Sequence, residues 1–292
     1  MGEDKSILFT LVYVAEALTL FFLGLGVAHY LGFQMDWEHS FLGLGWIILL
    51  LLSGIFLRSS FLSQSYSSTG KSSKNTPDDP KISRSFILAI ALLASEASLT
   101  VLLISKAFIT PQTLFIMVCC VIGMLLLSLP TIRNYLNGFQ EILFSFMMVF
   151  FIPLFGFEIQ AQDVHRMILM ITVPLFSLRL SATLAYELAT YATDIKQLNS
   201  TLLVRIGWQN GMFLHNILIL FGFLLIILAV IFGMSVSIAL PAMGGLILGL
   251  YQIWAMRKIA EGRKPIWRSL VLGDFSLYVL IVYLLTYSFW VR

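Results

Sequence analysis

The chain has 292 residues, of which 59% are hydrophobic and 11% are charged, and its formal net charge is +3. A soluble domain carries about 25% charged residues, so this composition excludes an ordinary soluble protein and indicates a polytopic membrane protein. Alternating barrel strands are absent from the sequence, and the backbone of a lipid-embedded segment must satisfy its own hydrogen bonds, so helical spans are expected. No nucleic-acid partner is expected.

Nine apolar stretches run along the chain with no soluble domain between them. Each is about as long as a helix needs to be to cross a bilayer. We therefore predict one all-α membrane domain over residues 1–292. The stretches cover residues 7–33, 40–57, 85–106, 110–129, 139–157, 164–187, 209–233, 235–256 and 270–290.

The positions of Lys and Arg orient this bundle. If the N-terminus lies inside, the inner segments hold fourteen of these cations and the outer segments hold three, Lys106, Arg166 and Arg292. Cytoplasmic loops of membrane proteins carry such an excess of positive charge. The sequence therefore predicts a multi-pass protein of the cytoplasmic (inner) membrane, with its N-terminus inside and its C-terminus outside.

One inner segment differs from the rest in composition. Residues 63–83 are rich in Ser, Lys, Pro and Asp and show no apolar periodicity. Such a segment cannot bury a core, so a flexible cytoplasmic loop is expected there.

Three ionisable residues, Glu16, Glu96 and Arg179, fall inside predicted spans. Charges at membrane depth are costly and usually pair with one another. Arg179 is therefore expected to form an interhelical pair with Glu16 or Glu96.

The most distinctive polar stretch is the connector Tyr186–Trp208, between the sixth and seventh apolar stretches. It reads YELATYATDIKQLNSTLLVRIGW and ends in Thr201-Leu202-Leu203-Val204-Arg205-Ile206-Gly207. This tail resembles the second signature of the UbiA superfamily of intramembrane prenyltransferases, in which an acidic cluster precedes a similar segment. The resemblance aligns Asp194 with the last acid of that cluster. It implies a magnesium role for Asp194 and, one helical turn before the first acid position at Thr190, for Glu187.

A second inner connector also resembles a UbiA element. Residues 129–140 read LPTIRNYLNGFQ, and Pro130, Arg133 and Gln140 fall on positions of the family pattern. The resemblance implies that cations contact the diphosphate of an isoprenyl donor, where an arginine offers two donors. It assigns Arg133, Lys196 and Arg205 to the diphosphate, and Gln140 and Tyr191 to the acceptor or prenyl group.

The first acidic signature of the family is missing after the second span. The positions that align with its carboxylates hold Ser63, Tyr66 and Ser72, and the next acids are Asp78 and Asp79. Magnesium needs oxygen ligands and usually binds one or two carboxylates besides substrate phosphates. The cofactor implied by the resemblance is Mg²⁺, but the lost acids predict that metal-dependent activity is weakened or absent.

These observations predict an all-α integral membrane protein with a nine-helix UbiA-like bundle. The function that the resemblance implies is transfer of an isoprenyl group from a diphosphate donor to an aromatic or quinone-type acceptor. The alternative is a non-catalytic protein that binds an isoprenoid or lipid, or a structural subunit of a membrane complex. Expected partners are an isoprenyl diphosphate or another phosphorylated lipid, and membrane lipids. The sequence assigns no catalytic residue.

Overall fold

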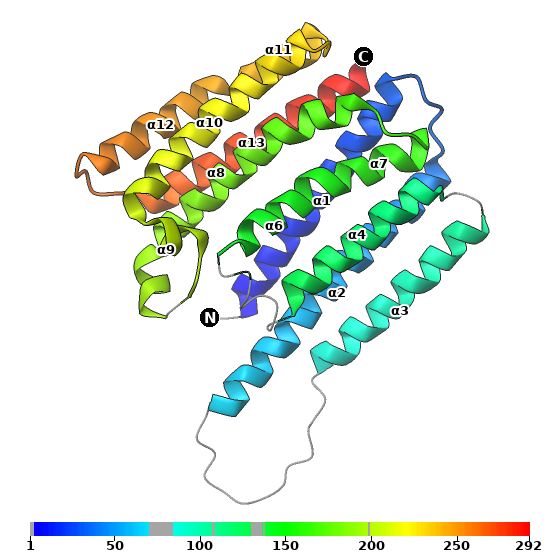
Figure 1. Ribbon diagram of the computed structural model, residues 1–292, viewed down its shortest axis with the longest axis horizontal. Coiled ribbons are helices and arrows are strands. Elements are labelled where there is room, and N and C mark those ends of the chain that lie inside the picture. Colours follow the sequence, from blue (N-terminus) through cyan, green and yellow to red (C-terminus); the bar gives the residue numbers. More distant parts are fainter. Residues whose placement is uncertain (1–2, 70–83, 107–108, 130–135, 137, 198) are drawn as a thin grey trace, which may run out of the picture.

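The structure of the protein is a computed structural model that describes residues 3–69, 84–106, 109–129, 136, 138–197 and 199–292. Its described residues form helices joined by short turns (Figure 1). The helices are α1 (Glu3–Tyr30), α2 (Trp37–Thr69), α3 (Arg84–Ser105), α4 (Pro111–Ser128), α6 (Gln140–Phe146), the π-helix η1 (Met147–Phe151), α7 (Ile152–Ala161), α8 (Arg166–Lys196), α9 (Leu202–Ile206), α10 (Trp208–Ile231), α11 (Val236–Met243), α12 (Leu246–Ala260) and α13 (Trp267–Val291).

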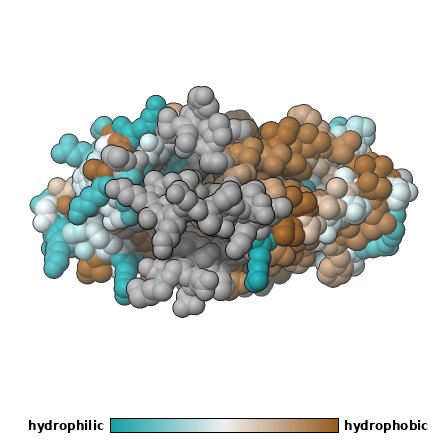
Figure 2. Space-filling view, turned by 90° about the horizontal axis from the view of Figure 1, so that it is seen from below, coloured by the Kyte–Doolittle hydropathy of each residue, from teal (hydrophilic) through white to brown (hydrophobic). Residues whose placement is uncertain are grey.

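Nine helical segments within the described residues are long and apolar enough to cross a membrane, which confirms the predicted all-α membrane bundle. The fifth span joins α6, η1 and α7, and the eighth joins α11 and α12. The protein is therefore a multi-pass integral membrane protein. In Figure 2 hydrophilic side chains gather on the left of the face, and hydrophobic side chains cover much of the described surface on its right, with some hydrophilic ones at the right edge.

Two expectations about the spans need correction. Helix α2 continues to Thr69, so the first seven residues of the predicted loop 63–83 are helical, and residues 70–83 lie outside the described part of the chain. Helix α8 continues to Lys196, so the first half of the predicted connector Tyr186–Trp208 is helical. The polar side chains of these stretches lowered their hydropathy without interrupting the helices.

The packing of helices inside the bundle centres on α1 and α8. Helix α1 lies against α7 and α13, α8 lies against α10 and α13, and α3 packs on α2. The α1–α7 contact is close because both helices present glycine: a Cβ on Gly24 would lie 2.0 Å from the Pro153 carbonyl oxygen, and one on Gly156 would lie 2.6 Å from the Phe21 carbonyl oxygen. Small residues allow such close approach between membrane helices.

A buried ion pair joins α1 to α8. The Arg179 Nε donates to Glu16 Oε1 at 2.6 Å, its Nη2 donates to Glu16 Oε2 at 3.3 Å, and its Nη1 donates to Thr183 Oγ1 at 2.8 Å. Glu16 and Arg179 are 4% and 6% exposed. The interhelical pair expected for Arg179 is thus formed with Glu16, whereas Glu96 is buried on α3.

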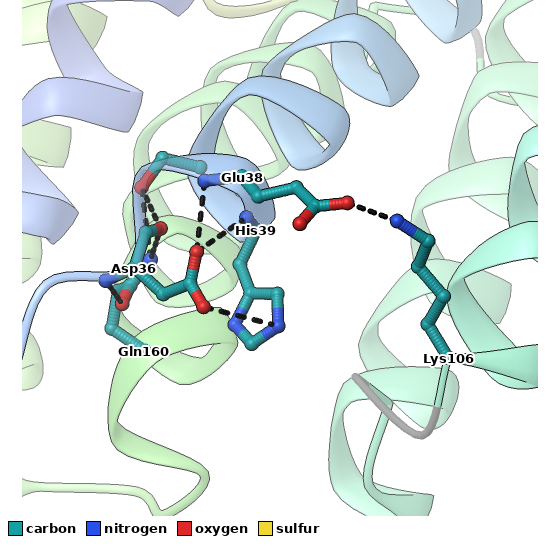
Figure 3. A network of polar contacts seen from close by, with 6 residues as sticks. Asp36, Glu38, His39, Lys106 and Gln160 are labelled. Carbon is teal, nitrogen blue, oxygen red and sulfur yellow. Dashed lines mark hydrogen bonds and ion pairs between the residues drawn. The ribbon is translucent and has the colours of Figure 1, made fainter.

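The predicted outer turns meet at one end of the bundle. The Gln160 side chain accepts a hydrogen bond from the Asp36 backbone and donates back to the Asp36 carbonyl, and an ion pair joins Lys106 to Glu38 (Figure 3). This network ties α7 and α3 to the start of α2. The N-terminus, α9 and the α12–α13 turn lie at the opposite end (Figure 1). The predicted inner and outer segments are thus sorted to two ends, and their orientation in a membrane stays a prediction.

Candidate functional site: an apolar pocket beside a polar connector

An apolar pocket lies between α1, α2, α4 and the fifth span, and its empty space of about 950 Å³ includes the part that is open to the outside. The residues of α2 that form one wall recur every four positions between Trp46 and Arg58, so they lie on a single face of the helix. The mostly apolar lining suits an apolar ligand. The lining residues are Tyr13, Trp46, Ile47, Leu50, Leu51, Gly54, Ile55, Arg58, Cys120, Met124, Leu127, Ser128, Phe144, Met147, Met148, Phe151, Ile152 and Phe155.

The π-helix η1 shapes the wall opposite α2. It directly precedes Pro153, whose missing N–H cannot make the regular helical hydrogen bond. A π turn changes the direction in which neighbouring side chains point, and such turns occur often at functional sites. Here the fifth span presents Met147, Met148 and Phe151 to the pocket.

The two ends of the pocket differ in polarity. At one end lies Arg58, an exposed residue near the inner end of the α2 span, together with Ser128 at the end of α4. At the other end lie Trp46 and Phe155, each 1% exposed. Arg58 is the one charged residue among the described residues that line the pocket. The cavity is therefore amphipathic, with a positive charge at the predicted cytoplasmic end.

Glu187 near the end of α8 is buried, with 3% exposure, and holds the connector in place. Its Oε2 accepts a hydrogen bond from the Leu203 backbone N–H at 2.8 Å, in the first turn of α9. A carboxylate in this position satisfies an N–H that has no partner within the helix. Its Oε1 is buried without a hydrogen-bond partner among the described residues.

Asp194 lies on the same face of α8 as Thr190 and Glu187. Its Oδ2 accepts a hydrogen bond from Thr190 Oγ1 at 2.7 Å, and its Oδ1 accepts one from Asn199 Nδ2 at 3.1 Å. The Asp194 backbone carbonyl also accepts a hydrogen bond from the Asn199 N–H at 2.9 Å. One carboxylate oxygen therefore binds within α8, and the other joins the end of α8 to the turn before α9.

The sequence missed a third acid near this connector. Glu141 follows Gln140 in the first turn of α6, and its charge acts on the Glu187 carboxylate. Gln140 Nε2 donates to Glu141 Oε1 at 2.9 Å. Within the described parts of the chain, however, no three His, Cys, Asp or Glu side chains lie where they would hold one metal ion. Glu187, Asp194 and Glu141 thus do not form a three-carboxylate group among the described residues.

The predicted cations have three different placements. Lys196 is exposed at the last turn of α8. Arg205 is exposed on α9, and its guanidinium carbon lies 4.9 Å from the centre of the Phe139 ring. Arg133 lies outside the described residues. The connector thus brings Arg205 beside the start of α6, next to the predicted diphosphate-binding segment.

The two residues assigned to the acceptor or prenyl group lie outside the pocket wall. Gln140 contacts Glu141, and Tyr191 packs on Trp208 with ring centres 5.6 Å apart. Neither belongs to the described residues that line the pocket. Their assigned roles stay predictions.

The comparisons with known proteins address the fold. No protein-family model and no curated protein matches this chain by sequence. Among solved structures, a digeranylgeranylglyceryl phosphate synthase aligns over 100% of this chain and 98% of its own, with a TM-score of 0.65 and 16% identity. A UbiA homologue from Archaeoglobus fulgidus bound to GPP and Mg²⁺ aligns over 97% and 99%, with a TM-score of 0.62 and 15% identity. This chain has the fold of the UbiA superfamily.

A second structure of the Archaeoglobus fulgidus UbiA homologue, bound to DMAPP and Mg²⁺, aligns over 94% of this chain and 98% of its own, with a TM-score of 0.56 and 14% identity. These alignments cover nearly all of both chains, so the similarity of fold extends over the whole bundle and not over one part of it. The resemblance at residues 129–140 and 186–208 predicted this fold, but the described residues that line the pocket lie outside these two segments. The sequence signal for the pocket was the repeated face of α2 from Trp46 to Arg58, which apolar periodicity alone does not separate from a lipid-facing surface.

Proposed function

We propose that this protein binds an isoprenyl diphosphate, or another phosphorylated lipid, with its chain in the apolar pocket and its phosphate near Arg58. The single observation that carries this proposal is the amphipathic pocket itself, which has apolar walls and one positive charge at its inner end. Burial of a hydrocarbon chain contributes about 0.8 kcal/mol per CH₂ group. A guanidinium contributes charge-assisted hydrogen bonds to phosphate oxygens.

The reaction that we propose is transfer of the isoprenyl group to an aromatic or quinone-type acceptor, with metal-dependent activity that is weakened or lost. Solved proteins of this fold bind GPP and DMAPP together with Mg²⁺. Departure of diphosphate develops negative charge, and fixed cations stabilise such charge. In this chain that stabilisation falls to Arg58 and to the predicted cations Arg133, Lys196 and Arg205. Fewer carboxylates mean slower transfer.

A second candidate is a non-catalytic isoprenoid-binding protein or a subunit of a membrane complex. The observation that favours it is the engagement of the two predicted metal ligands in local structure. Glu187 binds the Leu203 N–H, and Asp194 binds Thr190 and Asn199. Acids that are held in structural hydrogen bonds are less available to a metal ion. A pocket beside such acids suits binding of an isoprenoid better than a reaction in which its diphosphate leaves.

One assay separates these candidates. Detergent-purified protein is incubated with a radiolabelled isoprenyl diphosphate and a panel of aromatic acceptors, with Mg²⁺ and with a chelator, and both bound label and product are measured. Product in either condition supports the transferase. Retained binding without product supports the non-catalytic candidate. Absence of both overturns the proposal of a lipid diphosphate ligand.

Two arginine variants test whether the phosphate of the bound ligand lies beside Arg58. Arg58→Gln is expected to weaken binding of the diphosphate about tenfold, since a hydrogen bond to a charged group contributes about 1.5–3 kcal/mol. Arg84→Gln is the matched control, because Arg84 is also exposed near the inner end of the bundle but does not line the pocket. Equal binding by the two variants would contradict a phosphate position beside Arg58.

We also propose that the protein resides in the cytoplasmic membrane with its N-terminus inside. The excess of inner Lys and Arg supports this orientation. Glu261 in the α12–α13 turn and Gln162 after α7 are exposed at opposite ends of the bundle. In intact cells a membrane-impermeant thiol reagent is expected to label Gln162→Cys and not Glu261→Cys. The reverse pattern would invert the orientation.

A further inference from the structure

The buried end of the pocket is built from two aromatic rings held in fixed positions. The Trp46 and Phe155 ring centres lie 5.2 Å apart, and each residue is 1% exposed. The Trp46 Nε1–H donates to Thr100 Oγ1 on α3 at 2.9 Å, and Thr100 Oγ1 donates in turn to the Glu96 carbonyl. The indole is therefore anchored through α3, a helix that does not itself line the pocket.

The side walls contrast with this end. Met124, Met147 and Met148 line them, and methionine is unbranched and fills irregular space by changing rotamer. The Met147 side chain lies against Gly123, where a Cβ would come within 2.3 Å of Met147 Cε. Side walls of this kind adapt to the width and kinks of a hydrocarbon chain. An anchored indole at the end does not adapt to its length.

The distance available to a chain follows from α2. Arg58 and Trp46 lie about three helical turns apart on that helix, which is roughly 18 Å along its axis. A ligand whose phosphate lies at Arg58 must therefore end before the indole or leave the pocket. Leu50 lines the same wall one turn nearer to Arg58 than Trp46.

We propose that Trp46 sets the maximum length of the isoprenyl chain that the pocket accepts. This inference rests on the proposed function, and it adds a determinant of specificity within that ligand class. Removing the indole extends the apolar cavity toward α3, whereas adding an indole at Leu50 closes it one turn earlier. The two substitutions must then shift the preferred length in opposite directions.

The test measures dissociation constants of purified protein for a series of dimethylallyl, geranyl, farnesyl and geranylgeranyl diphosphates. In Trp46→Ala the affinity for the first chain that exceeds the wild-type limit is expected to rise by about tenfold or more, because two additional buried CH₂ groups suffice for that change. In Leu50→Trp the longest chain accepted by the wild type is expected to lose a similar factor, with shorter chains unaffected.

The controls separate length selection from general damage. Trp37→Ala removes an indole from the same helix at a position that is 49% exposed and outside the pocket, so its length profile should equal that of the wild type. Trp46→Phe serves if Trp46→Ala does not fold, with a smaller shift in the same direction. Wild-type binding with identical length profiles in Trp46→Ala and Leu50→Trp would overturn the role of Trp46. Absence of binding at every length in the wild type would overturn the proposed function and this inference with it.

Discussion

The pocket between α2 and the fifth span and the α8–α9 connector lie in the same bundle but use their residues differently. The pocket has an open, mostly apolar volume, and Arg58 is the one charged side chain among the described residues that line it. The connector contains Asp194, which the resemblance aligns with the last acid of the second signature, and Glu187, and both accept hydrogen bonds from backbone or side-chain donors of the connector itself. The pocket thus leaves space open inside the bundle, whereas the polar groups of the connector bind one another.

This difference reflects two kinds of tolerance to substitution. An apolar cavity persists through many exchanges of hydrophobic side chains if volume and pattern are kept. A divalent cation site does not, because it requires oxygen ligands in a defined number and geometry. This chain has the apolar pocket, whereas Ser63, Tyr66 and Ser72 stand where the resemblance places the acids of the first signature.

The largest effect is expected from breaking the Glu16–Arg179 ion pair. It joins α1, which contributes to the pocket, to α8, which leads into the connector. Arg179→Ala removes the partner of Glu16 and leaves a carboxylate buried between α1 and α8. Breaking a buried ion pair in this way costs about 3–5 kcal/mol. The thermal midpoint in detergent should fall strongly, and binding of lipid diphosphate should fall with it, since α1 contributes Tyr13 to the pocket.

The double variant Glu16→Met with Arg179→Met is the control for this prediction. It removes both charges and keeps apolar volume, so it should recover most of the lost stability. A double variant as unstable as Arg179→Ala would show that packing, and not the uncompensated charge, determines the loss.

A smaller effect is expected at Glu187, and it separates a structural from a metal-binding role. Glu187→Ala leaves the buried Leu203 N–H without an acceptor, which costs about 1–3 kcal/mol. Glu187→Gln keeps an acceptor oxygen in place and should lose less stability. If Glu187 instead acts mainly on magnesium, the two variants would lose any Mg²⁺-dependent transfer equally while differing little in thermal midpoint.

Asp194 offers the sharpest functional test of the connector. Asp194→Ala removes two hydrogen bonds at a partly exposed position and should cost about 1 kcal/mol or less of stability. If Mg²⁺-dependent transfer occurs, this variant should abolish it, because the resemblance places Asp194 on the metal. Unchanged turnover in the radiolabel assay would remove Asp194 from the mechanism.

The smallest effect on diphosphate affinity is expected from the exposed residue Arg205 on α9. Arg205→Lys keeps the charge but loses the planar contact with Phe139, which is worth about 0.5–1 kcal/mol at an exposed site. Diphosphate affinity should fall by no more than a few-fold. The loss should be reproduced by Phe139→Leu, and a tenfold or larger loss in Arg205→Lys alone would place Arg205 directly on the ligand.

Much of the fold was predictable because bilayer physics constrains it. Hydropathy located all nine spans, and the cost of charge at membrane depth predicted a partner for Arg179. The extension of α8 to Lys196 was missed because hydropathy decreases after Glu187 while the backbone continues as a helix. The pocket was missed because the residues of α2 that line it, such as Trp46 and Leu50, have the same apolar character as lipid-facing residues. The structural use of Glu187 depends on the approach of α9, which spacing alone does not show.

The Glu16–Arg179 pair also has a consequence for biosynthesis. Its members are 163 residues apart, so at about 5–20 residues per second the ribosome takes roughly 8 to 30 s to supply Arg179 after Glu16. During that interval the first span carries a carboxylate without its guanidinium partner. The first span must therefore be accommodated with an unpaired carboxyl group until α8 is made, and chains that terminate before the sixth span never form this pair.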